Sequence, residues 1–137
     1  MKDHEREHIG HTKFYVGCLP CLTNSYPNMA SDYHHVAPGR KRLGHLVGFG
    51  MCLWHHRGER DWTWSHLPMT EIKERLGPSL ARDKRQFRDR YGDELLLVKL
   101  NNFALSLWSR DPWMEHLMPN SVMQEIQAEH RRLLLEA

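Results

Sequence analysis

Apolar side chains recur at helical spacing throughout the second half of the chain. Between residues 93 and 108, leucines and a phenylalanine stand three or four positions apart, which predicts a helix with one face against a core. A charged helix is expected over residues 79–91 and a short one over 70–76, because a glycine follows each at the position that commonly ends a helix. A last helix is expected to begin at Ser121 and Gln124, whose spacing is that of a capping box.

Short apolar runs separated by turn formers predict strands in the first half of the chain. Residues 13–16 form a β-prone run, and residues 32–36 and 46–53 are the expected strands, the first of these two ended by proline and glycine. An exposed basic loop is expected over 40–45, and a helix is expected from about Trp54. The predicted order in this half is therefore strand, loop, strand and helix.

The three cysteines of the chain stand with one histidine at the spacing of zinc ligands. Two residues separate Cys18 from Cys21, and two separate Cys52 from His55. A closed structural zinc site uses four cysteine or histidine ligands, commonly arranged as two such pairs. The odd number of cysteines also argues against a disulfide framework and for metal binding in a reducing compartment. The spacing thus predicts a structural zinc ion on Cys18, Cys21, Cys52 and His55.

Three further histidines, His34, His35 and His56, form a candidate reactive centre. In a helix His55 and His56 point about 100° apart, so His55 can face the zinc ion while His56 faces away. His34 and His35 point to opposite faces of a regular strand, so both serve one centre only if the strand bends or ends near residues 37–39. In this scheme His34 and His56 hold a catalytic divalent cation, Mg²⁺ or Mn²⁺, and His35 acts as general base on a water molecule. The alternative for His56 is an ordinary surface histidine.

Positive charge is concentrated in the part of the chain that carries the cysteines. Residues 1–92 hold 15 lysines and arginines against 10 acidic residues, or +5, whereas residues 93–137 hold 4 against 7, or −3. A local basic excess suits a polyanion such as nucleic acid, although a solvated surface of mixed charge explains the same composition. The candidate nucleic-acid-binding residues are Arg40, Lys41, Arg42, His45 and Arg57.

Length and hydropathy limit the class of protein. A chain of 137 residues suits one domain, and its composition is ordinary for a soluble globular protein. No apolar run approaches the roughly 20 residues of a membrane span, and the polar start of the chain differs from a secretory signal. We therefore expect a cytoplasmic protein with no membrane partner.

The cysteine and histidine pattern resembles that of HNH (ββα-metal) endonucleases. Within that group it is most similar to the recombination-enhancement, RecA-dependent nuclease family of phages and prophages. The likeness covers about residues 13–100. The stretches that carry it are residues 18–21, 34–36, 39–40, 44–45, 51–58 and 87–92.

The resemblance implies a metal-dependent DNA endonuclease that hydrolyses phosphodiester bonds, with phage recombination as its setting. It implies zinc on the four ligands named above, His35 as general base, and His34 with His56 on a catalytic Mg²⁺ or Mn²⁺ ion. The implied partners are DNA and RecA-coated single-stranded DNA. The implied location is the cytoplasm of a bacterial host or a phage-infected cell.

The expected fold class is α+β, with a small zinc-stapled ββα-metal (HNH) core followed by several helices. We expect a disordered N-terminal tail over residues 1–12, the zinc-bound nuclease core over 13–66, and a helical C-terminal extension over 67–137 packed on or beside the core. Two non-catalytic functions stay open. One is a zinc-stabilised module that binds nucleic acid without cutting it, and the other is a protein-interaction domain in which zinc is only a staple.

Overall fold

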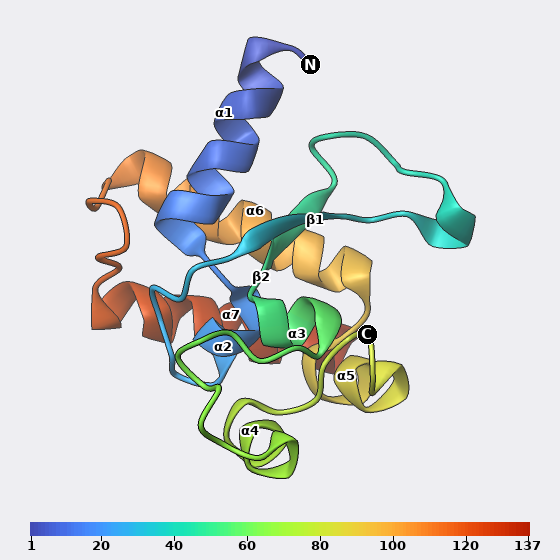
Figure 1. Ribbon diagram of the computed structural model, residues 1–137. Helices are drawn as coiled ribbons and strands as arrows, with labels where there is room; N and C mark the ends of the chain where they lie inside the picture. The colour runs from blue at the N-terminus through green and yellow to red at the C-terminus, as the bar shows by residue number, and fades with distance from the viewer.

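Helices surround a single two-stranded sheet in this protein (Figure 1). The computed structural model describes residues 1–137 without a gap. Along the chain the elements are α1 (Asp3–His11), η1 (Thr12–Val16), α2 (Leu19–Thr23), β1 (Asp32–His35), η2 (Pro38–Arg40), β2 (Gly48–Met51), α3 (Leu53–Arg57), α4 (Met69–Leu76), α5 (Lys84–Tyr91), α6 (Glu94–Arg110) and α7 (Asn120–Glu136). The predicted α+β class and the order strand, strand, helix are confirmed. None of the helices is both long and apolar enough to cross a membrane.

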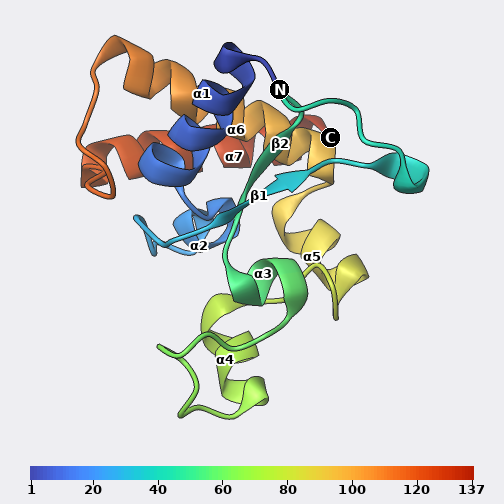
Figure 2. The same cartoon turned by 45° about the horizontal axis from the view of Figure 1, so that its top comes forward.

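β1 and β2 form an antiparallel pair that crosses the middle of the molecule (Figure 2). The register sets Asp32 opposite Met51, and every residue of β2 is buried. A Cβ atom at Gly50 would lie 2.3 Å from the carbonyl oxygen of Gly17. Glycine at position 50 therefore lets the segment that leads into the first cysteine pair pass close to the strand that leads into the second.

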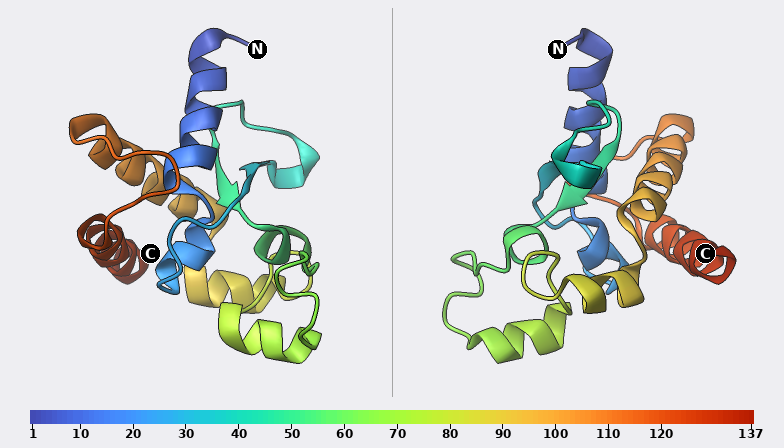
Figure 3. Two further views of the ribbon diagram at one scale, coloured as in Figure 1. Left: turned by 60° about the vertical axis from the view of Figure 1, so that its left-hand side comes forward. Right: turned by 90° about the vertical axis from the view of Figure 1, so that its right-hand side faces the viewer.

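The main hydrophobic core joins the sheet to the two long C-terminal helices. α6 packs against β2 and against α7, and Figure 3 shows the two helices together on one side of the hairpin. Phe49 of β2, Leu97 and Leu100 of α6, and Ile126 of α7 are fully buried in this core. The C-terminal helices and the hairpin therefore fold around the same apolar interior.

A smaller apolar cluster encloses the three cysteines. Trp54 of α3 and both Ile72 and Leu76 of α4 are buried around them. The indole N–H of Trp54 donates to the carbonyl oxygen of Gly77 at 2.9 Å, which ties α3 to the end of α4. α3, α4 and α5 gather at this end of the hairpin (Figures 1 and 3). The cluster keeps water away from the thiols.

The N-terminal segment is a helix, which corrects the expectation of a disordered tail over residues 1–12. α1 covers nine residues of that range. The ring centroids of His11 and Trp108 are 4.5 Å apart. The His8 ring meets the Tyr33 ring edge-on, with 6.0 Å between their centroids. These aromatic contacts come from distant parts of the chain, so the polar local sequence did not indicate them.

Two local expectations are also wrong. Residues 13–16, expected as a β-prone run, belong to the π-helical turn η1 that continues directly from α1. α7 begins at Asn120, so Ser121 and Gln124 lie inside the helix and form no capping box at its start. Pro119 has extended backbone angles and its carbonyl oxygen accepts from the first free amides of α7. The proline, with its fixed φ, therefore sets the helix start.

Replacing Leu97 by alanine tests the main core. Leu97 is fully buried, so Leu97→Ala is expected to lower the free energy of unfolding by about 2–5 kcal/mol. Leu95 of the same helix is 50% exposed, and Leu95→Ala is expected to change that free energy by less than about 0.5 kcal/mol. Urea unfolding of both variants measures the difference. Equal losses in the two variants would contradict the packing described.

Acid is expected to destabilise the fold through His130 of α7. The His130 ring is buried and donates from Nε2 to the Tyr91 carbonyl oxygen at 2.8 Å, and burial lowers its pKa below the ordinary 6.5. The unfolded chain therefore takes up this proton at a higher pH than the folded chain does. The stability that the neutral ring contributes is present above about pH 6.5 and is lost as the pH falls below it.

Urea unfolding between about pH 7.5 and about pH 5.5 measures this effect. The wild type should lose stability more steeply than His130→Gln, by up to about 1.4 kcal/mol per pH unit. Parallel pH profiles of the two proteins would show that His130 has no such role.

Candidate metal centre and active site

Two helix starts position the four predicted zinc ligands. Cys18 is the N-cap residue of α2 with Cys21 one turn later, and Cys52 is the N-cap residue of α3 with His55 one turn later. An N-cap side chain folds back over the first turn of its helix. The Sγ atom of Cys52 accepts from the His55 amide at 3.5 Å in this way. Each pair therefore presents two ligand atoms to the same side.

The four ligand atoms form a buried cluster of tetrahedral size. The Nδ1 atom of His55 lies 3.5, 3.4 and 3.2 Å from the Sγ atoms of Cys18, Cys21 and Cys52, and the Sγ atoms of Cys21 and Cys52 are 3.7 Å apart. Around zinc at its usual bond lengths, tetrahedral edges are about 3.6 Å between nitrogen and sulfur and about 3.8 Å between two sulfurs. All ligand atoms lie within 4.8 Å of one another. The four residues therefore fit a closed zinc site.

Neighbouring hydrogen bonds fix the ring of His55. Its Nε2 donates to the carbonyl oxygen of Leu76 at 2.7 Å, which leaves Nδ1 as the lone-pair atom that faces the sulfurs. The same carbonyl accepts from the Asn24 amide at 2.7 Å and from the Tyr91 hydroxyl at 2.9 Å. Ligating histidines in metal sites commonly have such a partner on the second ring nitrogen. The surroundings of His55 thus suit a metal ligand.

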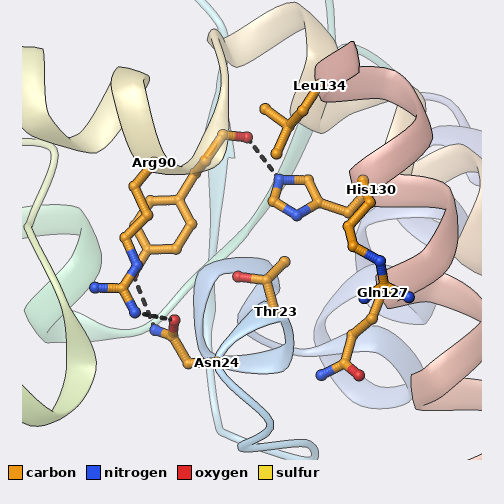
Figure 4. A pocket seen from close by; sticks show the side chains of 8 residues that line it. Thr23, Asn24, Arg90, Gln127, His130 and Leu134 are labelled. Atoms are coloured by element: carbon orange, nitrogen blue, oxygen red, sulfur yellow. Dashed lines mark hydrogen bonds between the residues drawn. The ribbon is translucent and has the colours of Figure 1, made fainter.

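A polar hollow of about 300 Å³ lies beside this network, and Figure 4 shows its lining. Arg90 donates to Oδ1 of Asn24 at 2.7 Å on one wall, and His130 on the facing helix donates to the Tyr91 carbonyl oxygen at 2.8 Å. Burial raises the pKa of the Tyr91 hydroxyl to about 12, so this group stays protonated and donates. The residues beside the cysteine–histidine cluster therefore also tie α2, α5 and α7 together.

The charges of the thiols are linked to metal binding. Without a bound ion, burial raises the pKa of the Cys18 thiol, whereas hydrogen bonds from Cys18 and Cys21 lower the pKa of Cys52. A divalent cation favours the thiolate form of all three residues at once. Binding of the ion therefore releases protons and contributes directly to folding.

A second group of side chains joins β1, α3 and the start of α6. The Nδ1 atom of His34 lies 3.2 Å from Nε2 of His56, and Nε2 of His34 lies 2.6 Å from Oε1 of Glu94. The structure thus brings His34 and His56 together, as the sequence predicted. Glu94 was missed because it lies 60 residues after His34, and an acidic residue in the first turn of a helix is ordinary. The hydrogen bond from His34 lowers the pKa of Glu94, which favours the ionised carboxylate.

His35 points toward the loop between the strands. Its Nε2 atom lies 3.2 Å from Nδ1 of His45, whose carbonyl oxygen accepts from the Tyr33 hydroxyl at 2.9 Å. Burial lowers the pKa of both His35 and His56, so their rings are neutral near pH 7. Because β1 ends at His35, the side chains of His34, His35 and His56 still line one open hollow of about 590 Å³. Its other lining residues are Asp32, Tyr33, Ala37, Arg42 and Arg57.

The structure divides the five predicted nucleic-acid-binding residues. Arg42 and Arg57 line the hollow, and His45 contacts the neighbouring imidazole as just described. Arg40 and Lys41 are exposed on the loop that projects from the hairpin in Figure 2, and they do not line the hollow. The cationic groups nearest the histidines are therefore Arg42 and Arg57.

Removal of one thiol tests the zinc assignment. Wild-type protein is expected to bind one zinc ion, and Cys18→Ser is expected to lose it and to unfold at a lower urea concentration, because such a site contributes folding free energy. Elemental analysis and urea unfolding measure the two effects. His66→Ser, which replaces an exposed histidine, is the control and should retain both zinc and stability. A full zinc content with unchanged stability in Cys18→Ser would remove Cys18 from the ligand set.

A protein-family model matches most of this chain. The family model described as recombination enhancement, RecA-dependent nuclease matches residues 3–105. No curated protein and no solved structure matches the chain. The matched range contains Cys18, Cys21, Cys52 and His55, the hollow lined by His34, His35 and His56, and Glu94, and it extends through most of α6. The chain therefore belongs to the recombination enhancement, RecA-dependent nuclease family.

Proposed function

We propose that this protein is a metal-dependent DNA endonuclease of the HNH type that hydrolyses phosphodiester bonds. The observation that carries the proposal is the meeting of His34, His35 and His56 in one open hollow. The hollow lies on a strand–strand–helix unit that also carries a zinc-binding cluster. The nuclease description of the family supports the same reaction class.

His34 and His56 are the proposed ligands of a catalytic cation, Mg²⁺ or Mn²⁺. Their facing nitrogens are 3.2 Å apart, and two nitrogens at that distance can each lie about 2.1 Å from one ion. Such an ion would stabilise the charge that develops on the leaving oxygen of the scissile phosphodiester. The buried Nδ1 atom of His56 has no hydrogen-bond partner, so no hydrogen bond at that atom fixes the orientation of the ring.

His35 is the proposed general base. A neutral imidazole that donates from Nε2 to His45 has Nδ1 free to take a proton from the attacking water. The short distance between the two rings and the hydrogen bond from Tyr33 to the His45 backbone restrict the orientation of His35. His45 is therefore proposed to orient the base as well as to lie near the substrate.

Arg42 and Arg57 are the proposed contacts to the DNA backbone next to the reacting phosphate. Both line the hollow, so their side chains lie near a phosphate that reaches the histidines. Arg40 and Lys41 extend the positive charge along the exposed loop, where they add phosphate contacts that depend on salt concentration. Arginine suits such contacts because its planar donors match phosphate oxygens.

The proposed setting is phage recombination in the cytoplasm of a bacterial host or a phage-infected cell. The family description names RecA, which supports RecA-coated single-stranded DNA as a partner. All three cysteines are free thiols, which suits a reducing compartment.

Replacing His35 by alanine tests the proposal. Zinc-loaded wild type, His35→Ala and the control His66→Ala are incubated with Mg²⁺ or Mn²⁺ and supercoiled, linear, single-stranded or RecA-coated DNA. The initial rate of DNA cleavage should fall about 10²–10⁴-fold in His35→Ala, because the general base is lost. Zinc content and DNA affinity should stay at wild-type levels in both variants.

Two outcomes would contradict the endonuclease proposal. Undiminished cleavage by His35→Ala would remove His35 from the mechanism. A wild type that binds DNA but cuts none of these substrates with either cation would leave the non-catalytic nucleic-acid-binding module as the better account.

A further inference from the structure

We propose that Glu94 is a positioning residue that sets the ring orientation and the tautomer of His34, so that the Nδ1 lone pair of His34 faces His56. The inference rests on the proposed function, because the pair His34 and His56 is the cation site of that proposal. It assigns a functional role to the first residue of α6, outside the strand–strand–helix unit.

The contact between Glu94 and His34 is short and shielded. Oε1 of Glu94 lies 2.6 Å from Nε2 of His34, which is shorter than an ordinary N–H···O hydrogen bond. The side chains of His34 and Glu94 are only 17% and 21% exposed. Water therefore competes weakly for either partner, and the bond holds the imidazole in one orientation.

The chemistry of a carboxylate decides which nitrogen of His34 carries the proton. An ionised carboxylate only accepts hydrogen bonds, so the Nε2 atom that faces Glu94 must donate. In the neutral ring the other nitrogen, Nδ1, then has a free lone pair. That atom lies 3.2 Å from Nε2 of His56. The proposed cation would bind to these two nitrogens. Glu94 thus presents the correct atom of His34 toward the cation site.

The backbone around Glu94 is held firmly. Asp93 caps α6 by accepting from the Leu96 amide at 2.8 Å, and a carboxylate in this first turn is favoured by the helix dipole. The same helix is anchored by Leu97 and Leu100, which are fully buried in the main core. The position of Glu94 relative to β1 is therefore set by the packing of a 17-residue helix, and not by a mobile loop.

The position of Glu94 does not suit a third ligand of the cation. The carboxylate lies on the far side of the His34 ring from His56, because it meets Nε2 while His56 meets Nδ1. In this geometry it cannot share one ion with both histidines. A purely structural contact would stabilise the junction of α6 and β1 without affecting the cation. The affinity for Mn²⁺ separates that role from positioning.

The experiment measures Mn²⁺ binding to the zinc-loaded full chain, without DNA, by electron paramagnetic resonance of the free ion. Glu94→Ala should raise the Mn²⁺ dissociation constant about 10–100-fold, as loss of the partner of a ligating histidine does. Glu94→Gln keeps an oxygen acceptor without charge and should give a smaller increase. Glu125→Gln, which removes one exposed charge from α7, should bind Mn²⁺ as the wild type does.

Cleavage adds a second measurement. In Glu94→Ala the Mn²⁺ concentration needed for half-maximal rate should rise by a similar factor, whereas the rate at saturating Mn²⁺ should stay close to that of the wild type. Zinc content and the urea midpoint of each variant are measured beside it. Unchanged Mn²⁺ dependence in a folded Glu94→Ala protein would overturn the positioning role.

The tautomer of His34 gives a readout that needs neither cleavage nor a variant. Nitrogen-15 NMR of the zinc-loaded wild type without Mn²⁺ should find His34 protonated at Nε2. A proton at Nδ1 would overturn the inference. If the wild type binds Mn²⁺ and cuts DNA but the Glu94 variants do the same, the inference alone fails. If the wild type binds no second cation, both the inference and the proposed cation site are wrong.

Discussion

The burial of three thiols and one imidazole in a single cluster is the constraint on which the rest of the structure depends. Burying a polar group that has no bonding partner costs folding free energy. Here four such ligand groups meet within a small apolar cluster. A zinc ion bound to all four would offset this cost. The two pairs begin α2 and α3, so an ion bound to them would fix the segments that flank the hairpin relative to each other.

The positions of His34 and His56 follow from that constraint. Because His55 turns toward the sulfurs, its neighbour His56 must turn about 100° away around the short helix α3. The antiparallel register carries His34 to the same place, opposite Phe49, just before the chain reaches Cys52. A single short helix therefore connects a structural site on one side to a candidate catalytic site on the other.

The parts of this arrangement that could be predicted from the sequence are those marked by local spacing or by a distinctive residue type, such as the paired cysteines and histidines. The ligand pairs are three positions apart on helix starts, and α6 shows its buried side in the spacing of its leucines. The contact between Glu94 and His34 could not be predicted, because its partners are 60 residues apart and it depends on how α6 packs against β2.

The sequence predictions that the structure corrects failed for a related reason, because contacts outside the local pattern decide these segments. α1 is polar on most sides, and it is held by ring contacts to Tyr33 and Trp108 that no local pattern reveals. Residues 13–16 have β-branched and aromatic character, but they continue the backbone of α1 into the core. The helix α7 begins directly after Pro119, whose φ is fixed, and not after Ser121, whose spacing to Gln124 is that of a capping box.

Anomalous diffraction from crystals of the zinc-loaded protein soaked in Mn²⁺ tests the central claim most directly. The account predicts a zinc peak enclosed by Cys18, Cys21, Cys52 and His55, and a separate manganese peak between Nδ1 of His34 and Nε2 of His56. A manganese ion bound elsewhere, or a zinc ion that lacks any of the three sulfurs, would contradict it.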